Sequence, residues 1–177
     1  EYWDGDRRIN YGGYKYIPGR WNKIILNLID YYDLPKESKI LDIGCGKGFF
    51  LYDFQQISSN FDVYGLDISQ YAIENSKPEV KEKLICGNAT SLPWPDNYFD
   101  LVVSINTFHN LYAFDLEKAL IEMERVGKNK YLCVESYRNE DEKATQPQTR
   151  EESSSVPPTP VSAENQALED QLEVVPF

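Results

Sequence analysis

The stretch KILDIGCGKGFF, residues 39–50, decides the fold. It begins as a short apolar run, passes through glycines at alternate positions, and continues with aromatic residues at helical spacing. This order is typical of a strand, a tight turn and a helix. Gly44, Gly46 and Gly48 allow a sharp backbone turn, and because they lack Cβ atoms they leave room for a ligand against the chain. The stretch therefore predicts a ligand-binding turn directly after a strand.

The alternation of strand and helix continues along the chain. A leading helix is predicted from Trp21 to Tyr32, and further strands are predicted at 62–66, 84–86, 99–105 and 131–135. The run 99–105 is the most apolar, and we expect it in the middle of the sheet. Ser69 and Asp115 are the expected N-caps of two later helices. The inward stripe of the last helix is predicted to consist of Leu116, Ala119, Leu120 and Met123. This alternation predicts an α/β fold with a mostly parallel sheet between two layers of helices.

The glycine spacing and the acid before it indicate the ligand. The glycines read G-x-G-x-G and not the G-x-G-x-x-G of dinucleotide sites, and Asp42 would repel a diphosphate. In these features the segment resembles the first motif of the class I S-adenosylmethionine-dependent methyltransferases. The resemblance implies a Rossmann-like three-layer sandwich with strand order 3-2-1-4-5. It also implies S-adenosylmethionine as cofactor, with contacts to its methionine and ribose portions from Asp42, Gly44, Cys45, Gly46 and Gly48.

Further positions match the family between residues 39 and 135. Asp67 ends the second strand, where the family's acidic residue holds the ribose hydroxyls, and a carboxylate can accept both. The resemblance places Ile68 against the adenine and Asn88 with Ala89 at the adenine edge. The segment from Leu92 to Asp100 is similar to the group called type 11, which includes many small-molecule methyltransferases.

The segment 104–110 follows the fourth strand, where ligands bind in open α/β sheets. Ser104 is a candidate cofactor contact, and the following residues are expected to face the methyl acceptor. His109, the one histidine of the chain, has two interpretations. It could act as a general base for an acceptor hydroxyl, or it could pack against the cofactor at the entry to a helix.

The amino-terminal region, 1–38, is predicted to form a cap of aromatic loop and helix. Its aromatic residues, Tyr11, Tyr14, Tyr16 and Trp21, would suit either a lid over a sulfonium cation or a brace under the sheet. Arg20 is a candidate partner for the methionine carboxylate.

The core is predicted to span 39–139, followed by an acidic Pro/Ser-rich tail, 140–177, for which disorder is expected. Within the tail, 163–175 could form a short docking helix, or it could remain solvated. The resemblance also implies an antiparallel C-terminal hairpin, and we expect this hairpin to be missing because the polar tail follows the fifth strand. The fifth strand is therefore expected to be an open edge at which a protein partner could bind, as it could at the tail.

Composition narrows the function. The formal charge of −11 disfavours nucleic acid as acceptor, and no apolar stretch reaches the ~20 residues of a membrane span. The three cysteines lack metal-ligand spacing and are interpreted as core, which fits a cytoplasmic protein without a metal site. We expect an S-adenosylmethionine-dependent methyltransferase acting on a small molecule. The alternatives are an inert or truncated binding module that needs a partner, and an NAD-binding domain.

Overall fold

A parallel sheet of five strands organises the protein. The computed structural model describes residues 3–4 and 14–133. The strands pair in parallel in the order β3-β2-β1-β4-β5, which confirms the predicted Rossmann-like topology. Their bounds are β1 (Lys39–Ile43), β2 (Asp62–Asp67), β3 (Leu84–Cys86), β4 (Phe99–Ile105) and β5 (Gly127–Cys133).

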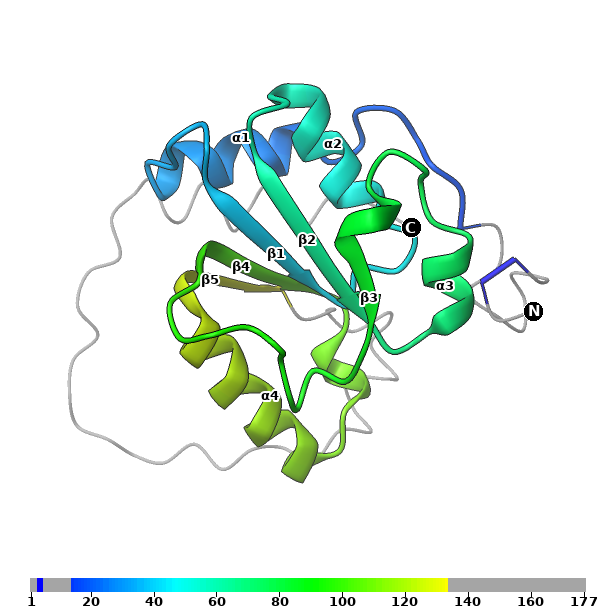
Figure 1. Ribbon diagram of the computed structural model, residues 1–177, viewed down its shortest axis with the longest axis vertical. Helices are drawn as coiled ribbons and strands as arrows, with labels where there is room; N and C mark the ends of the chain where they lie inside the picture. Colours follow the sequence, from blue (N-terminus) through cyan, green and yellow to red (C-terminus); the bar gives the residue numbers. More distant parts are fainter. Residues whose placement is uncertain (1–2, 5–13, 134–177) are drawn as a thin grey trace, which may run out of the picture. The chain divides into compact units, whose positions relative to one another are not determined.

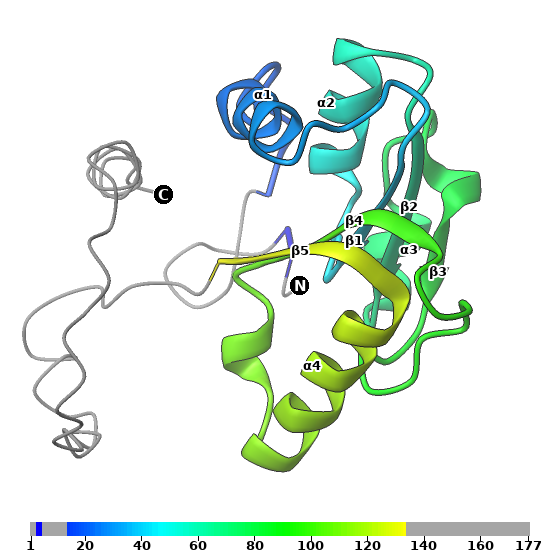
Figure 2. The same ribbon diagram turned by 90° about the vertical axis from the view of Figure 1, so that its left-hand side faces the viewer.

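Helices cover both faces of this sheet (Figures 1 and 2). Helices α1 (Asn22–Tyr31) and α2 (Phe49–Ile57) lie on one face, and α4 (Ala113–Val126) lies on the other. The short helix α3 (Gln70–Glu74) lies next to β3. Two 3-10 turns, η1 (Lys81–Lys83) and η2 (Phe108–Asn110), complete the described elements. The three-layer arrangement predicted from the alternating pattern is therefore confirmed.

Each face of the sheet has its own apolar core. Phe50 and Phe54 of α2 pack with Ile25 of α1 on one face, while Ala119 and Met123 of α4 lie in the cluster on the other. Burial of such side chains stabilises a fold by roughly 1.5–3 kcal/mol each. Because α1 contributes to the same cluster as α2, this helix of the predicted cap packs directly on the sheet domain.

Helix α4 begins earlier than the sequence indicated. Its N-cap is Tyr112, whose backbone is extended and whose side chain makes no capping hydrogen bond. Asp115 lies in the first turn, where a carboxylate interacts favourably with the positive end of the helix dipole, so its assignment as N-cap was wrong. Leu120 was wrongly placed inward and is 40% exposed, because it is rotated about 100° from Ala119. Val126 completes the buried stripe instead.

Three strand assignments also need correction. The middle strand is β1, because β4 has β5 alone beyond it among the described strands. Strand β5 begins at Gly127, directly after α4, and Glu135 lies outside the described residues. Cys86, which we interpreted as core, is exposed, since β3 is an edge strand. The predicted tail, its docking helix and Tyr11 also fall outside the described residues.

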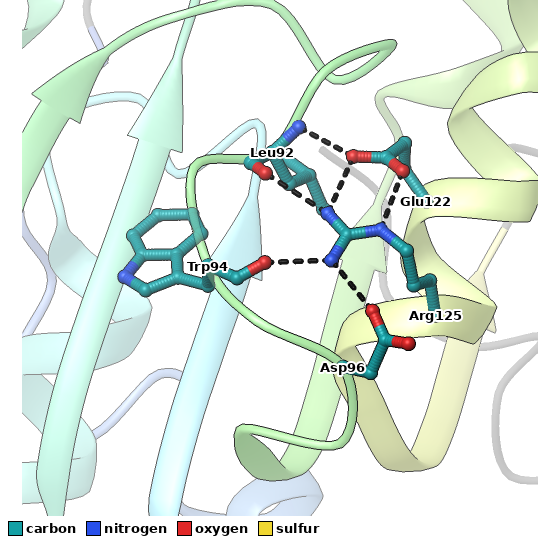
Figure 3. A network of polar contacts seen from close by, with 5 residues as sticks. All are labelled: Leu92, Trp94, Asp96, Glu122 and Arg125. Atoms are coloured by element: carbon teal, nitrogen blue, oxygen red, sulfur yellow. Dashed lines mark hydrogen bonds and ion pairs between the residues drawn. The ribbon is translucent and has the colours of Figure 1, made fainter.

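Arg125 of α4 fixes the loop between β3 and β4 (Figure 3). Its guanidinium donates hydrogen bonds to the carbonyl oxygens of Leu92 and Trp94 and forms ion pairs with Asp96 and Glu122. The Glu122 carboxylate in turn accepts from the Leu92 N–H at 2.7 Å. A planar guanidinium suits such a network because it offers five donors in a rigid arrangement. The segment that resembles the type 11 group is thereby held against α4.

In the part of the chain that the structure describes, no helix combines the length and the apolar character that crossing a membrane requires.

Candidate functional site

The glycine turn after β1 takes the backbone conformation that the sequence predicted. Gly44, Gly46 and Gly48 all have positive φ, at 84°, 52° and 73°. The N–H groups of Gly44 and Cys45 donate to the carbonyl oxygen of Leu66, which ties the turn to β2. A Cβ on Gly44 would overlap the Thr107 side chain, so a glycine is needed there for packing as well as for φ. The turn brings the ends of β1, β2 and β4 together.

Asp67 lies at the centre of this meeting point. Its two carboxylate oxygens accept from the Gly46 N–H at 2.7 Å and from the Ser69 N–H at 2.8 Å. Ser69 also caps α3 through the Ala72 N–H, as predicted. The Asp67 side chain is nearly covered, at 6% exposure, and burial raises its pKa. A carboxylate offers about four acceptor positions, so one on each oxygen remains for a ligand.

Asp42 is a second buried carboxylate in the same place. It is 5% exposed, and no described residue donates a hydrogen bond to it. Burial, together with the nearby negative charge of Asp67, raises the pKa of Asp42 to about 8. Burial and the same two carboxylates raise the pKa of the Cys45 thiol well above its usual range. The site therefore favours cations and proton donors over anions, and Cys45 is no thiolate nucleophile.

The hydrogen-bond acceptors of the site fit S-adenosylmethionine. Among the described residues, neither Asp42 nor Asp67 has an ion-pair partner, although buried carboxylates are normally paired. Asn106, directly after β4, adds a buried Oδ1 that lacks a hydrogen-bond partner, on a backbone with φ of 53°. Two carboxylates and one orphaned amide oxygen match a ligand that carries an ammonium group, a sulfonium and a ribose diol. In their ionised forms the two carboxylates would repel a diphosphate.

The predicted adenine contacts divide into exposed and buried residues. Ile68 is 75% exposed and Asn88 is exposed, so both could meet a flat ring. The Asn88 side chain accepts from the Thr90 N–H at 3.0 Å, which holds the turn after β3. Ala89 is buried among the core residues beneath α4, so its backbone is the part that could contact a ligand.

The candidates after β4 also separate. Ser104 has no exposed surface, and its hydroxyl donates to the Ile43 carbonyl oxygen at 3.0 Å, so it joins β4 to β1. The Ser104 side chain therefore has a structural role, and a contact of Ser104 with a cofactor stays a prediction. His109 is exposed on η2, beyond the carboxyl end of β4. The structure thus brings the acidic residues and the glycines together. It places His109 on the turn that follows the carboxyl end of β4.

The amino-terminal aromatic residues act mainly as a brace. The Tyr16 hydroxyl and the backbone N–H of Trp21 both donate to the fully buried Asp53 of α2, at 2.6 and 3.2 Å. Tyr14 stacks on Phe49. Its ring lies near Gly46, so this predicted lid residue approaches the glycine turn. The Arg20 guanidinium lies over the Trp21 ring.

Two residues that contact the site were not predicted from the sequence. The Trp3 indole N–H donates to the Ser69 hydroxyl at 2.9 Å, and the Asp4 carboxylate pairs with Lys47 of the glycine turn at 2.7 Å. The aromatic density of the leader was the one available signal, because the contacts join residues 66 and 43 positions apart. The described residues contain no group of three His, Cys, Asp or Glu side chains arranged to hold a metal ion.

Comparison with known proteins agrees with this geometry. The profile of the methyltransferase-domain family matches residues 41–134. An uncharacterised protein of Methanocaldococcus jannaschii is 35% identical over 114 residues, covering 64% of this chain and 47% of that protein. A demethylmenaquinone methyltransferase of Anoxybacillus flavithermus is 34% identical over 113 residues, covering 59% of this chain and 47% of that enzyme. The chain thus spans about half the length of these curated relatives.

A solved structure of an S-adenosylmethionine-dependent methyltransferase from Aquifex aeolicus superimposes with a TM-score of 0.50 at 25% identity. The match covers 63% of each chain. Fold and family profile together define a class I methyltransferase domain. This chain belongs to the methyltransferase-domain family, as its glycine turn and acidic residues indicated.

Proposed function

We propose that this chain binds S-adenosylmethionine and transfers its methyl group to a small molecule. The observation that carries the proposal is the convergence of Asp42 and Asp67, both nearly covered and without described cationic partners, on a turn of left-handed glycines. Bound S-adenosylmethionine supplies an activated methyl group on a sulfonium. The protein then contributes mainly binding and alignment, which can lower a barrier by ~7–11 kcal/mol.

Each part of the site receives one role in this proposal. Asp67 accepts hydrogen bonds from the two ribose hydroxyls. Asp42 and Asn106 accept hydrogen bonds from the ammonium group of the cofactor. The glycine turn lies along the ligand between them, and Ile68 with Asn88 borders the adenine. A small-molecule acceptor agrees with the net charge of −11, which disfavours a polyanion such as nucleic acid.

Titration calorimetry of the purified chain with S-adenosylhomocysteine, beside NAD⁺, tests the proposal. We expect micromolar or tighter binding of the first ligand and none of the second, because acidic groups converge on the glycine turn where a diphosphate would lie, and the Lys47 ammonium of that turn is paired with Asp4. Binding of NAD⁺ in preference to S-adenosylhomocysteine would refute the assignment. Binding of S-adenosylhomocysteine without turnover of any acceptor would instead favour a binding module.

His109 is proposed as the base for an acceptor that must lose a proton. It is exposed at the carboxyl end of β4 and is expected to face the acceptor and not the cofactor. His109→Ala should therefore leave the Kd for S-adenosylhomocysteine within about twofold of the parent value, while turnover of a hydroxyl acceptor falls by roughly 10²–10⁴. A Kd weakened about tenfold or more would identify His109 as a residue that packs on the cofactor.

A further inference from the structure

Trp3 and Asp4, which we call the latch, hold the glycine turn and the start of α3 from outside (Figure 1 draws them as a short blue segment). The Asp4 carboxylate accepts from the Lys47 ammonium at 2.7 and 3.0 Å and from the Tyr71 hydroxyl at 2.6 Å. These bonds, with the hydrogen bond from Trp3 to Ser69, connect the latch to two elements of the site.

The Trp3 indole spans the two residues that hold Asp67. Its six-membered ring lies 3.2 Å from the position that a Cβ on Gly46 would occupy, and its N–H reaches the Ser69 hydroxyl. The backbone N–H groups of Gly46 and Ser69 are also the donors to the Asp67 carboxylate. The indole therefore lies beside the carboxylate to which the ribose is assigned, and Asp67 is left 6% exposed.

The latch is supported from behind as well. The Tyr14 N–H donates to the Trp3 carbonyl oxygen, and the two rings meet at 5.3 Å. Tyr14 in turn stacks on Phe49, the first residue of α2. The Lys47 side chain is 9% exposed and its partner Asp4 is 41% exposed, so solvent screens this ion pair from the Asp4 side only.

We infer that the Trp3–Asp4 latch closes the ribose end of the cofactor site and must open each time a cofactor enters or leaves. This inference rests on the proposed function and adds a control of exchange to it. If the closed latch blocks both directions, the observed association and dissociation rates both scale with the fraction of time that it is open. Weakening the latch should then raise both rates together and leave the equilibrium affinity nearly unchanged.

Stopped-flow binding of S-adenosylhomocysteine to Asp4→Asn and to Trp3→Phe, in the full chain, tests this. The first variant loses the ion pair with Lys47, and the second loses the donor to Ser69. We expect kon and koff each to rise by on the order of fivefold, with Kd within about twofold of the parent value. Asp30→Asn removes an equal charge at an exposed position on α1 and serves as the matched control, with unchanged rates.

A double-mutant cycle separates a latch from two independent effects. Lys47→Gln and Asp4→Asn should change the rates no more together than either does alone, because each breaks the same ion pair. Parent-like rates in Asp4→Asn and Trp3→Phe would overturn the latch while leaving the proposed function intact. An affinity loss with unchanged kon would also overturn it, since that is the behaviour of a fixed contact. Failure of the parent and all variants to bind would refute both proposals.

Discussion

Asp67→Ala is expected to weaken the binding of S-adenosylhomocysteine by on the order of 10²–10⁴-fold. In the proposed complex each carboxylate oxygen keeps its backbone donor, Gly46 or Ser69, and accepts one ribose hydroxyl in addition. Hydrogen bonds to a charged group are worth roughly 1.5–3 kcal/mol each, so losing two accounts for this factor. Titration calorimetry of the parent and the variant measures it directly.

The variant also loses the two backbone contacts of Asp67, so a change on the ligand side is needed as control. The parent should bind the 2′-deoxy analogue of S-adenosylhomocysteine more weakly than the ribose form, because one hydroxyl is missing. Asp67→Ala should lose most of that preference, since the group that reads the hydroxyl is gone. Equal discrimination by parent and variant would show that the ribose hydroxyls bind elsewhere. Similar melting temperatures would exclude unfolding as the cause.

The glycine turn and the two aspartates could be predicted because their information is local. Three glycines directly after a strand predict a tight turn, and such turns use the left-handed φ that glycine allows. The alternation of strands and helices predicts that β1 and β2 pair in parallel. Asp42 is the last but one residue of β1 and Asp67 is the last residue of β2, so parallel pairing brings both to the carboxyl end of the sheet.

Other features had no local signature. Tyr112 starts α4 without a capping side chain, so the nearest good capping residue, Asp115, was chosen instead. The burial of Ser104 depends on β1 beside it, and no local pattern indicated that its hydroxyl donates to the Ile43 carbonyl oxygen. The contacts of Trp3 and Asp4 join distant parts of the chain, and no spacing rule applies at that separation.

Asp42→Asn is expected to stabilise the ligand-free protein at pH 8 by several kcal/mol, at most about 5. In the folded protein the pKa of Asp42 is raised to about 8, whereas the ordinary pKa of an aspartate is 3.8. Between these values the folded state binds more protons than the unfolded state, so the free energy of unfolding falls as pH rises through this window. A neutral asparagine avoids that loss. Thermal unfolding at pH 5 and pH 8.5 should therefore show a smaller decline for the variant.

Asp53→Asn is the matched control for the stability experiment, because Asp53 is also fully buried but accepts from Tyr16 and Trp21. Removing its charge should destabilise the protein, since a carboxylate with two good donors is replaced by an amide that can accept at one oxygen. Stabilisation by both substitutions would mean that burial alone, and not the lack of donors at Asp42, causes the effect.

Asp42→Asn should also change how ligand binding depends on pH. A ligand that brings an ammonium group to Asp42 favours the ionised carboxylate, so binding near pH 7 should release a proton from the parent. The enthalpy of binding S-adenosylhomocysteine would then vary with the ionisation enthalpy of the buffer, and this variation should shrink in Asp42→Asn. A buffer-independent enthalpy in the parent would mean that Asp42 keeps its proton and does not meet the cationic end of the ligand. A destabilising, ionisable aspartate beside a ligand-binding turn is the arrangement expected where a site gives up stability for binding.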